Sequence, residues 1–299
     1  MKRLTLDVGS PDEGERIDRF IAARGGISRG EARRALDAGG VFLDGRRCKV
    51  AGRPVRAGQR VVVNLAEGGR ATAAAEPLAR SRLLYADAEV AAIDKPAGVP
   101  SQPTLTTDRG TLPELVAGLL GSPVTLVHRL DRDTSGVTVF ARTPSAAAAL
   151  AAAFREGTPD KTYLALCARA PAPPEGRIDA ALGKDPARAG LRRVDPRGDP
   201  AATRYRTLRD GPLAALVEAR PETGRTHQIR VHLAHLGAPL LGDARYGGPR
   251  RVGELPVPRV MLHARRLELL HPATGARLVL EAPVPEDLAA VERALIRSV

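Results

Sequence analysis

The chain has 299 residues and is 43% hydrophobic, so it can bury a sizeable core, which must be aliphatic because the chain has no Trp and only four Phe and four Tyr. Lys and Arg outnumber Asp and Glu by 46 to 34, giving a net charge of +12 and a pI near 10.6. A globular protein this basic is typical of one that binds a polyanion, with nucleic acid the leading candidate, although a compositional bias toward Arg would give the same excess. No long apolar run or leader-like segment occurs, and Cys48 and Cys167 lie far apart, so we expect a cytoplasmic protein without membrane spans or disulfides.

Residues 14–64 have the pattern of a compact unit of two helices and a hairpin. Ile17, Phe20 and Ile21 recur at helical spacing, which predicts a first helix with Asp18 and Arg19 facing solvent. Gly25 and Gly26 end that helix. Ser28 with Glu31 forms a capping box that predicts the start of the second helix. Residues 41–50, with Asp44-Gly45 at the turn, predict a hairpin, and residues 61–63 predict one further strand.

The basic residues are concentrated in this first unit. Residues 29–60 hold nine Lys and Arg against three Asp and Glu, and residues 1–65 hold fourteen against eight, which is +6 of the total +12. A basic helix beside a basic hairpin suits contacts to RNA phosphates rather than base reading. We expect these contacts from Arg29, Arg33, Arg34, Arg46, Arg47 and Lys49. Residues 16–45 resemble the small RNA-binding domain of the S-four type, named after a ribosomal protein of the small subunit.

The rest of the chain reads as a linker and one larger domain. Residues 66–81 lose periodicity and become rich in Gly and Ala, so the expected domains are 1–65, a linker at 66–81, and 82–299. Expected helices cover residues 111–120, 143–154 with Thr143 as N-cap, and 227–236 with Thr226 as N-cap; expected strands cover residues 90–93, 161–166, 204–208 and 213–217, and two more lie within 260–282. Residues 183–200 are expected to form an exposed loop. Because strands and helices do not alternate regularly, the sequence predicts an α+β domain with a mixed sheet.

Residues 126–136 (LVHRLDRDTSG) form the stretch richest in reactive groups. An apolar run precedes it and an alternating run follows, which indicates a loop between two strands with Gly136 allowing the turn back. Three interpretations compete for its chemistry. A phosphatase of the haloacid dehalogenase type would use Asp131 and Asp133, but the position of Thr134 does not fit. A metal site from His227, His232 and His235 has spacings that do not place all three on one helical face. A carboxylate stabilised by arginines could instead attack a sugar carbon.

Six motifs in order resemble the RluA-type pseudouridine synthases. They are residues 95–98 (KPAG), 128–136 (HRLDRDTSG), 161–165 (KTYLA), 224–232 (GRTHQIRVH), 240–247 (LLGDARYG) and 262–264 (LHA). The resemblance implies the pseudouridine synthase fold, with a mainly antiparallel sheet, and isomerisation of uridine to pseudouridine without a cofactor or metal. It also implies a catalytic carboxylate on Asp131, a base-stacking Tyr163, and an Arg230 that pairs with Asp131. Arg129 would fill the place that the flipped uridine leaves.

Several choices stay open at this stage. Asp131 could add to the sugar or assist a glycal route, and Asp133 is expected to brace the loop together with Thr134 and Ser135. The layout favours large-subunit ribosomal RNA as the substrate of a monomeric enzyme that does not contact a membrane, with transfer RNA as the alternative. The competing function is a catalytically silent RNA-binding or ribosome-assembly factor on the same fold, which intact Asp131, Tyr163 and Arg230 argue against.

Overall fold

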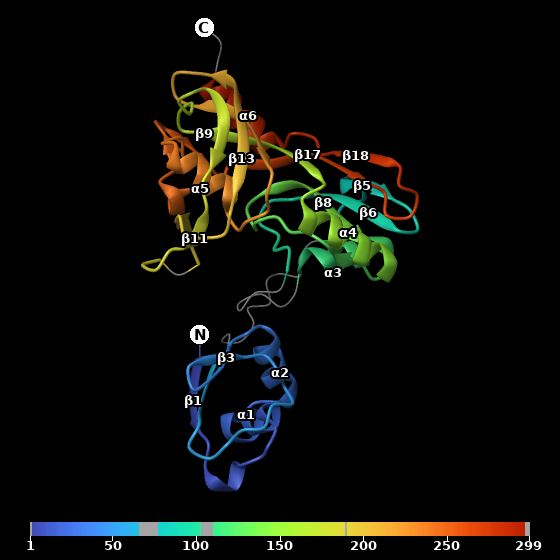
Figure 1. The fold of residues 1–299 in the computed structure, drawn as a ribbon, viewed down its shortest axis with the longest axis vertical. Helices are drawn as coiled ribbons and strands as arrows, with labels where there is room; N and C mark the ends of the chain where they lie inside the picture. The colour runs from blue at the N-terminus through green and yellow to red at the C-terminus, as the bar shows by residue number, and fades with distance from the viewer. Residues whose placement is uncertain (1, 66–76, 103–109, 189, 297–299) are drawn as a thin grey trace. The chain divides into compact units, whose positions relative to one another are not determined.

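The computed structural model describes residues 2–65, 77–102, 110–188 and 190–296 (Figure 1). The chain falls into two compact units, one made of residues 1–76 with 102–115 and the other of residues 77–101 with 116–299. We call them the N-terminal and C-terminal units and describe each by itself. The expected limits of the domains stay a prediction, and most of the expected linker, residues 66–76, lies outside the described residues. No helix in the described ranges has both the length and the apolar character needed to cross a bilayer.

The N-terminal unit is a four-stranded antiparallel sheet, in the order β1-β4-β2-β3, with two helices. Its elements are β1 (Lys2–Asp7), η1 (Ser10–Asp12), α1 (Ile17–Gly25), α2 (Arg29–Asp37), β2 (Val41–Leu43), β3 (Arg46–Cys48) and β4 (Arg60–Leu65). The capping box is confirmed, since Ser28 Oγ accepts from the Glu31 N–H and the Ser28 N–H donates to Glu31. Asp44 and Gly45 have φ of 49° and 75°, as the predicted hairpin turn requires. Strand β1 was not predicted.

The C-terminal unit is built on a ten-stranded sheet with the order β10-β13-β14-β9-β17-β8-β6-β5, to which β18 and β7 add beside β17 and β8. The strands are β5 (Leu83–Ala86), β6 (Val90–Lys95), β7 (Thr125–Leu126), β8 (Ser135–Ala141), β9 (Asp160–Cys167), β10 (Glu175–Asp179), β13 (Ala202–Asp210), β14 (Ala215–Pro221), β17 (Leu262–Leu270) and β18 (Arg277–Glu281). All pairs are antiparallel except β8 with β17. The predicted class, α+β with a mixed and mainly antiparallel sheet, is confirmed.

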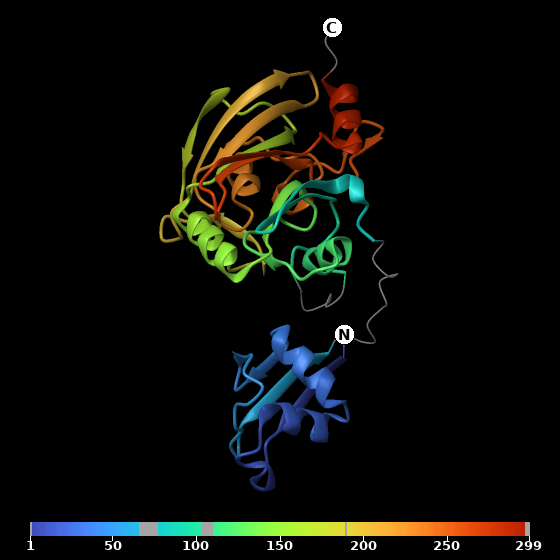
Figure 2. The same cartoon turned by 90° about the vertical axis from the view of Figure 1, so that its right-hand side faces the viewer.

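Helices cover both faces of this sheet. The alternation of β9 sends Ala165 and Cys167 toward α5, whereas Leu164 and Leu166 pack on the opposite side with α6 (Figure 2). Helix α4 packs against β8 through Ala146 and Leu150 (Figure 1). The helical segments wholly within the unit are η2 (Arg80–Arg82), α4 (Pro144–Glu156), α5 (Gln228–His235), η3 (Ala244–Tyr246) and α6 (Glu286–Leu295), and α3 (Leu112–Leu120) spans the boundary between the two units after Leu115. Thr143 caps α4 as predicted, because its hydroxyl accepts from the Ala146 N–H.

Residues 183–200 are not a plain loop, which corrects the expectation. They contain most of a short hairpin, and a second small hairpin lies further along; the strands are β11 (Leu182–Lys184), β12 (Arg192–Val194), β15 (Arg251–Val252) and β16 (Leu255–Pro256). The first hairpin is anchored because Leu182 is buried against Val231 of α5. Val194 of β12 packs against the same cluster, and the polar composition of the segment concealed these few apolar contacts.

Gly136 has a different role from the expected turn. It lies inside β8 with φ of +113°, where the strand runs parallel to β17. A Cβ at this position would overlap the backbone carbonyl oxygen of Ala264. Glycine is therefore required by the close approach of two central strands at the exit of the loop that carries Asp131.

Candidate active site

A cavity of about 260 Å³ opens beside the loop between β7 and β8. Its walls come from that loop, from the start of β9, from Phe154 of α4, and from the segment that joins β14 to α5 (Figure 1). Asp131, Arg129, Tyr163 and Arg230 all line it. The four residues proposed from three separate motifs therefore face one cavity of the C-terminal unit, although Asp131 and Arg230 are 99 residues apart in the chain.

Asp131 is held by an arginine that is itself held by a second carboxylate. Arg230 Nη1 donates to Asp131 Oδ2 at 3.0 Å, while Nε and Nη2 donate to the two oxygens of Asp243 at 2.6 and 2.9 Å. The Asp243 side chain is 1% exposed and the Asp131 side chain 20%. Burial opposes the charge of Arg230, but the two carboxylates, Asp243 before Asp131, raise its pKa. Arg230 is thus a fixed cation, and the exposed side of Asp131 faces the cavity.

Asp243 is a site residue that sequence reasoning missed. It does not line the cavity, and its forked pairing fixes the plane of the Arg230 guanidinium. The only signal was its place in the Gly242-Asp243 motif. A buried carboxylate of this kind cannot be recognised from spacing, since its arginine lies on another element.

The loop that carries Asp131 is braced by Lys95. The fully buried Lys95 Nζ donates to the carbonyl oxygens of Pro96, Arg132 and Thr134 at 3.0, 2.9 and 2.8 Å. Burial lowers its pKa to about 7, against the charges of Asp133 and Asp131. The expectation that Asp133 braces the loop through its side chain is not supported: Asp133 is exposed, and its contact is a backbone carbonyl that accepts from Arg259.

His128 and Tyr163 shape the wall of the cavity. His128 Nε2 accepts from the Val139 N–H at 2.9 Å, which extends the short pairing of β7 with β8, and its ring stacks on Phe154 with 4.3 Å between centroids. Burial, followed by the charge of Lys161, lowers the pKa of His128 to about 3, so the ring is neutral. Burial and then Asp131 raise the pKa of Tyr163, so its phenol keeps its proton. Arg129 is exposed at the rim.

The N-cap of helix α5 is His227, so the expectation that Thr226 is the N-cap is wrong. His227 has a left-handed backbone with φ of 59°, which turns the chain into the helix. The buried Gln228 side chain secures this turn, because its oxygen accepts from the Arg225 N–H and its nitrogen donates to the Ala202 carbonyl. This start of the helix directs Arg230 into the cavity.

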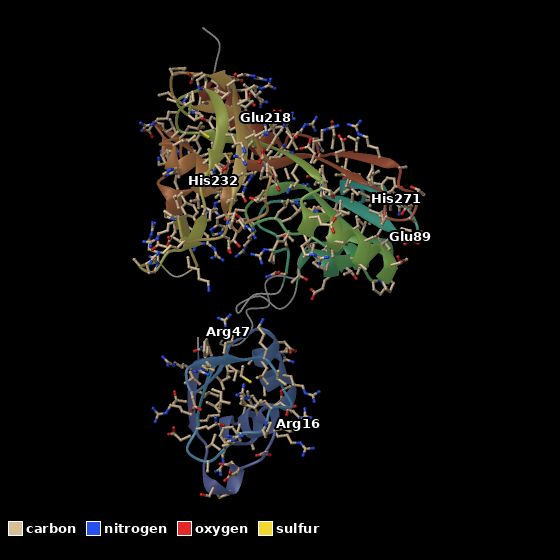
Figure 3. The ribbon with its side chains drawn as sticks, in the orientation of Figure 1. Arg16, Arg47, Glu89, Glu218, His232 and His271 are labelled. Carbon is tan, nitrogen blue, oxygen red and sulfur yellow. The ribbon has the colours of Figure 1, made fainter. Side chains whose placement is uncertain are left out.

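The histidines do not converge on a metal. Both ring nitrogens of His232 lie in hydrogen bonds, Nδ1 to Thr203 Oγ1 at 2.8 Å and Nε2 to the Ala180 carbonyl at 2.9 Å. Figure 3 shows His232, which lies on α5, far from His271 in the C-terminal unit. Within the described ranges, no group of three or more His, Cys, Asp or Glu could hold a metal ion.

The basic face of the N-terminal unit is organised by Asp18, which corrects the expectation that this residue faces solvent. Its carboxylate is fully buried and accepts from Arg16, Arg29 and Arg33 at 3.1, 3.2 and 2.9 Å. Burial alone would raise the pKa of Asp18, but these hydrogen bonds hold it well below its usual range. Two of the predicted RNA-binding arginines, Arg29 and Arg33, are therefore fixed on one carboxylate, and their own side chains are about half exposed.

The other predicted RNA-binding residues are also exposed on this unit. Arg47 lies over the Phe42 ring at 5.6 Å, and the stems of Arg47 and Lys49 pass close to Gly39 after α2. Arg46 shares β3 with Arg47, and Arg34 is exposed on α2. Arg16 and Arg47 are labelled in Figure 3. The helix and hairpin predicted to be basic do carry these cations at the surface.

Comparison with known proteins places this geometry in context. A family model described as RNA pseudouridylate synthase matches residues 89–235, and one described as S4 domain matches residues 15–61. An uncharacterized RNA pseudouridine synthase of Chloroflexus aurantiacus is 42% identical over 290 residues, which is 94% of this chain and 90% of the relative. The ribosomal large subunit pseudouridine synthase D of Xanthomonas campestris is 36% identical over 90% of this chain and 85% of its own. The solved human RNA pseudouridylate synthase domain containing 4 is 29% identical, with a TM-score of 0.59, over 71% of this chain and 92% of that one.

Proposed function

The chain belongs to the RNA pseudouridylate synthase family and carries an S4 domain, and from that premise we propose that it isomerises specific uridines of large-subunit ribosomal RNA, with Asp131 as the catalytic carboxylate. The observation that carries the assignment of Asp131 is its position at the cavity, 3.0 Å from a guanidinium that Asp243 holds in place.

The reaction needs little beyond such a carboxylate. The glycosidic bond between C1′ and N1 breaks, a bond between C1′ and C5 forms, the C5 proton leaves to solvent and N1 gains one. Atoms and electrons balance within the nucleotide, so no oxidant or energy source is consumed. Asp131 stabilises the electron-poor sugar either by adding to C1′ or by assisting a glycal route. Arg230 holds the carboxylate in position through the hydrogen bond from Nη1 to Oδ2.

The cavity suits a single uridine taken out of its stack. Extrusion of a base costs roughly a few kcal/mol. Tyr163 supplies an aromatic face for the flipped uracil, and with its raised pKa it acts as a neutral phenol rather than a base. Arg129 is exposed at the rim, where its guanidinium plane can occupy the gap in the RNA stack.

Two features support ribosomal RNA as the substrate. The relative from Xanthomonas campestris, which aligns over most of both chains, is named for the large ribosomal subunit. The basic surface of the N-terminal unit, with Arg29 and Arg33 fixed on Asp18, offers phosphate contacts outside the cavity. A large folded RNA can engage both units, since the phosphates bound by one need not lie near the uridine bound by the other.

The test uses the full-length protein and ribosomal RNA transcribed in vitro with uridine tritiated at C5. The wild type should release tritium, Asp131→Asn should lower the rate by roughly 10³-fold or more, and Asp133→Asn, which removes an exposed carboxylate of the same loop, should stay within about twofold. No release by the wild type from any cellular RNA would refute the enzyme assignment. Mapping pseudouridines in RNA from cells lacking the gene then identifies the site, and a missing site in transfer RNA alone would overturn the ribosomal assignment.

A further inference from the structure

His227 forms a hydrogen-bonded chain that none of the roles above uses. Its Nδ1 lies 2.6 Å from the hydroxyl of Tyr246, and that hydroxyl accepts from the Arg192 N–H at 3.0 Å. A tyrosine hydroxyl has one hydrogen, and with the Arg192 N–H pointing at its oxygen, that hydrogen is free to bond Nδ1. We therefore assign Nδ1 as the acceptor of this hydrogen bond and place the ring hydrogen on Nε2.

The Nε2 atom of His227 lies near the Asp131 oxygen that already accepts from Arg230 Nη1, and this carboxylate oxygen can accept a second hydrogen bond. Nε2 lies 3.9 Å from Asp131 Oδ2, which is too far for a direct hydrogen bond. An oxygen at about 2.8 Å from each atom fits between them, at an angle of about 90°. Such an oxygen must accept from Nε2–H and donate to the carboxylate. A hydroxyl meets both demands, whereas a uracil carbonyl or the ring oxygen of the sugar can only accept.

The nucleotide has one such hydroxyl next to the reacting carbon. Asp131 acts at C1′, and the 2′-hydroxyl is on the adjacent carbon. We propose that His227 Nε2–H donates to the 2′-oxygen of the flipped uridine while that hydroxyl donates to Asp131 Oδ2, so that the pair of residues selects ribose and aligns C1′ with the carboxylate. This inference rests on the proposed function of Asp131 and deepens it by adding a specificity-determining residue for RNA.

The surroundings of His227 support a fixed, neutral donor. Its side chain is 11% exposed, and its backbone has a φ of 59°, a conformation that histidine adopts at a cost. Burial lowers the pKa of its imidazole, as do the cations Arg230 and Arg245, and together they outweigh the opposing charges of Asp131 and Asp243. Strain kept at a cavity wall is typical of a residue held for its contact with a ligand.

The test is a cycle of two enzymes and two substrates. Synthetic RNA hairpins carry the uridine identified by mapping, either as ribouridine or as 2′-deoxyuridine at that one position. His227→Asn tolerates the positive φ but is too short to reach the 2′-oxygen, whereas His227→Gln places an amide N–H near the position of Nε2. The quantity measured is the ratio of kcat/KM on the ribose hairpin to kcat/KM on the deoxy hairpin. When this ratio is compared between the wild type and a variant, the difference in intrinsic reactivity of the two sugars cancels.

We expect His227→Asn to lower kcat/KM roughly tenfold on the ribose hairpin and less than about twofold on the deoxy hairpin, as loss of one hydrogen bond predicts. His227→Gln should recover part of the discrimination. An unchanged ratio in His227→Asn, with both substrates slowed equally, would show that His227 only supports the fold and would overturn the inference. If the wild type is inactive on the ribose hairpin, the proposed function fails instead. Thermal unfolding of each variant confirms that the comparison is made on folded protein.

Discussion

The substitution Asp243→Asn should slow catalysis, although Asp243 lies outside the lining of the cavity proposed to bind the uridine. Asp243 is 1% exposed, lies outside the cavity lining, and receives two hydrogen bonds from Arg230 at 2.6 and 2.9 Å. Asn keeps one acceptor but turns an NH₂ toward the guanidinium, so one of the two bonds becomes a contact between donors. Arg230 then has only Asp131 as a counterion, and its plane is no longer fixed.

The size of the effect follows from the burial of this pair. Breaking a buried ion pair by removing one partner costs about 3–5 kcal/mol, so the free energy of unfolding should fall by about that amount. Loss of a residue that orients a functional group typically costs about 10–100-fold in activity. We expect this loss in kcat, with KM changed by less than about twofold, because Asp243 has no contact with the cavity.

The assay is single-turnover tritium release at saturating enzyme, together with urea unfolding of the same preparations. Asp133→Asn is the matched control, since it removes one negative charge from an exposed side chain two residues from Asp131. It should change the unfolding free energy by no more than about 0.5 kcal/mol. A single-turnover rate at the wild-type level in Asp243→Asn, despite lowered stability, would refute the idea that Asp243 positions Arg230 for the reaction.

Three further predictions concern stability. Lys95→Met should cost about 3–5 kcal/mol, because three carbonyl oxygens lose their donor. Burial lowers the folded-state pKa of Lys95 to about 7, so from about pH 7 to 10 the unfolded chain holds a proton that the folded chain has lost, and the wild type should gain stability as the pH rises; urea titrations should not find this rise in the variant. Gly136→Ala should cost at least about 3 kcal/mol, because a Cβ would overlap the Ala264 carbonyl at a positive φ; thermal unfolding near the wild-type midpoint would contradict this. Asp18→Asn should raise the rate of amide hydrogen exchange in residues 2–65 only, because the three arginines lose their shared carboxylate. Since the pKa of Asp18 is lowered in the folded state, the contribution of Asp18 to stability should be complete above about pH 4 and be lost as the pH falls below it. Equal exchange rates in the wild type and the variant would count against the arginine cluster.

The sequence predicted the parts of the site that recur as short motifs. Asp131, Tyr163 and Arg230 were proposed from three separate stretches, and the fold brings them to one cavity. Elements with strong periodicity or explicit caps were also predicted, such as the capping box at Ser28 and the cap of α4 at Thr143. In each case the determining interactions lie within a few residues of chain, so the local pattern carries them.

The residues that sequence reasoning missed depend on partners far along the chain. Asp18 follows Ile17 in a helix, and its pattern is that of a solvent-facing position until Arg29 and Arg33 of the next helix are placed beside it. Asp243 needs Arg230 from α5, and the donor state of His227 needs Tyr246. A buried polar group is recognised by what surrounds it, and a single sequence does not show those surroundings.

The remaining incorrect predictions concern the N-cap of α5 and the hairpin in residues 183–200. Nothing in the apolar pattern before α5 distinguishes Thr226 from His227 as the N-cap, because a left-handed conformation of a non-glycine residue has no sequence signal. The hairpin of β11 and β12 was missed for a different reason, since most of its residues are polar and only a few apolar side chains, such as Leu182 and Val194, secure it.

The parallel pairing of β8 with β17 sets the order in which the molecule matures during translation. The strand that follows the loop carrying Asp131 gains this neighbour from a segment 128 residues later in the chain. At a synthesis rate of about 5–20 residues per second, that segment emerges on the order of ten seconds later. The N-terminal unit, whose strands all lie within residues 2–65, is complete long before. A nascent chain therefore acquires its basic surface first and its reactive centre last, so a truncated product that ends before β17 is an incomplete enzyme.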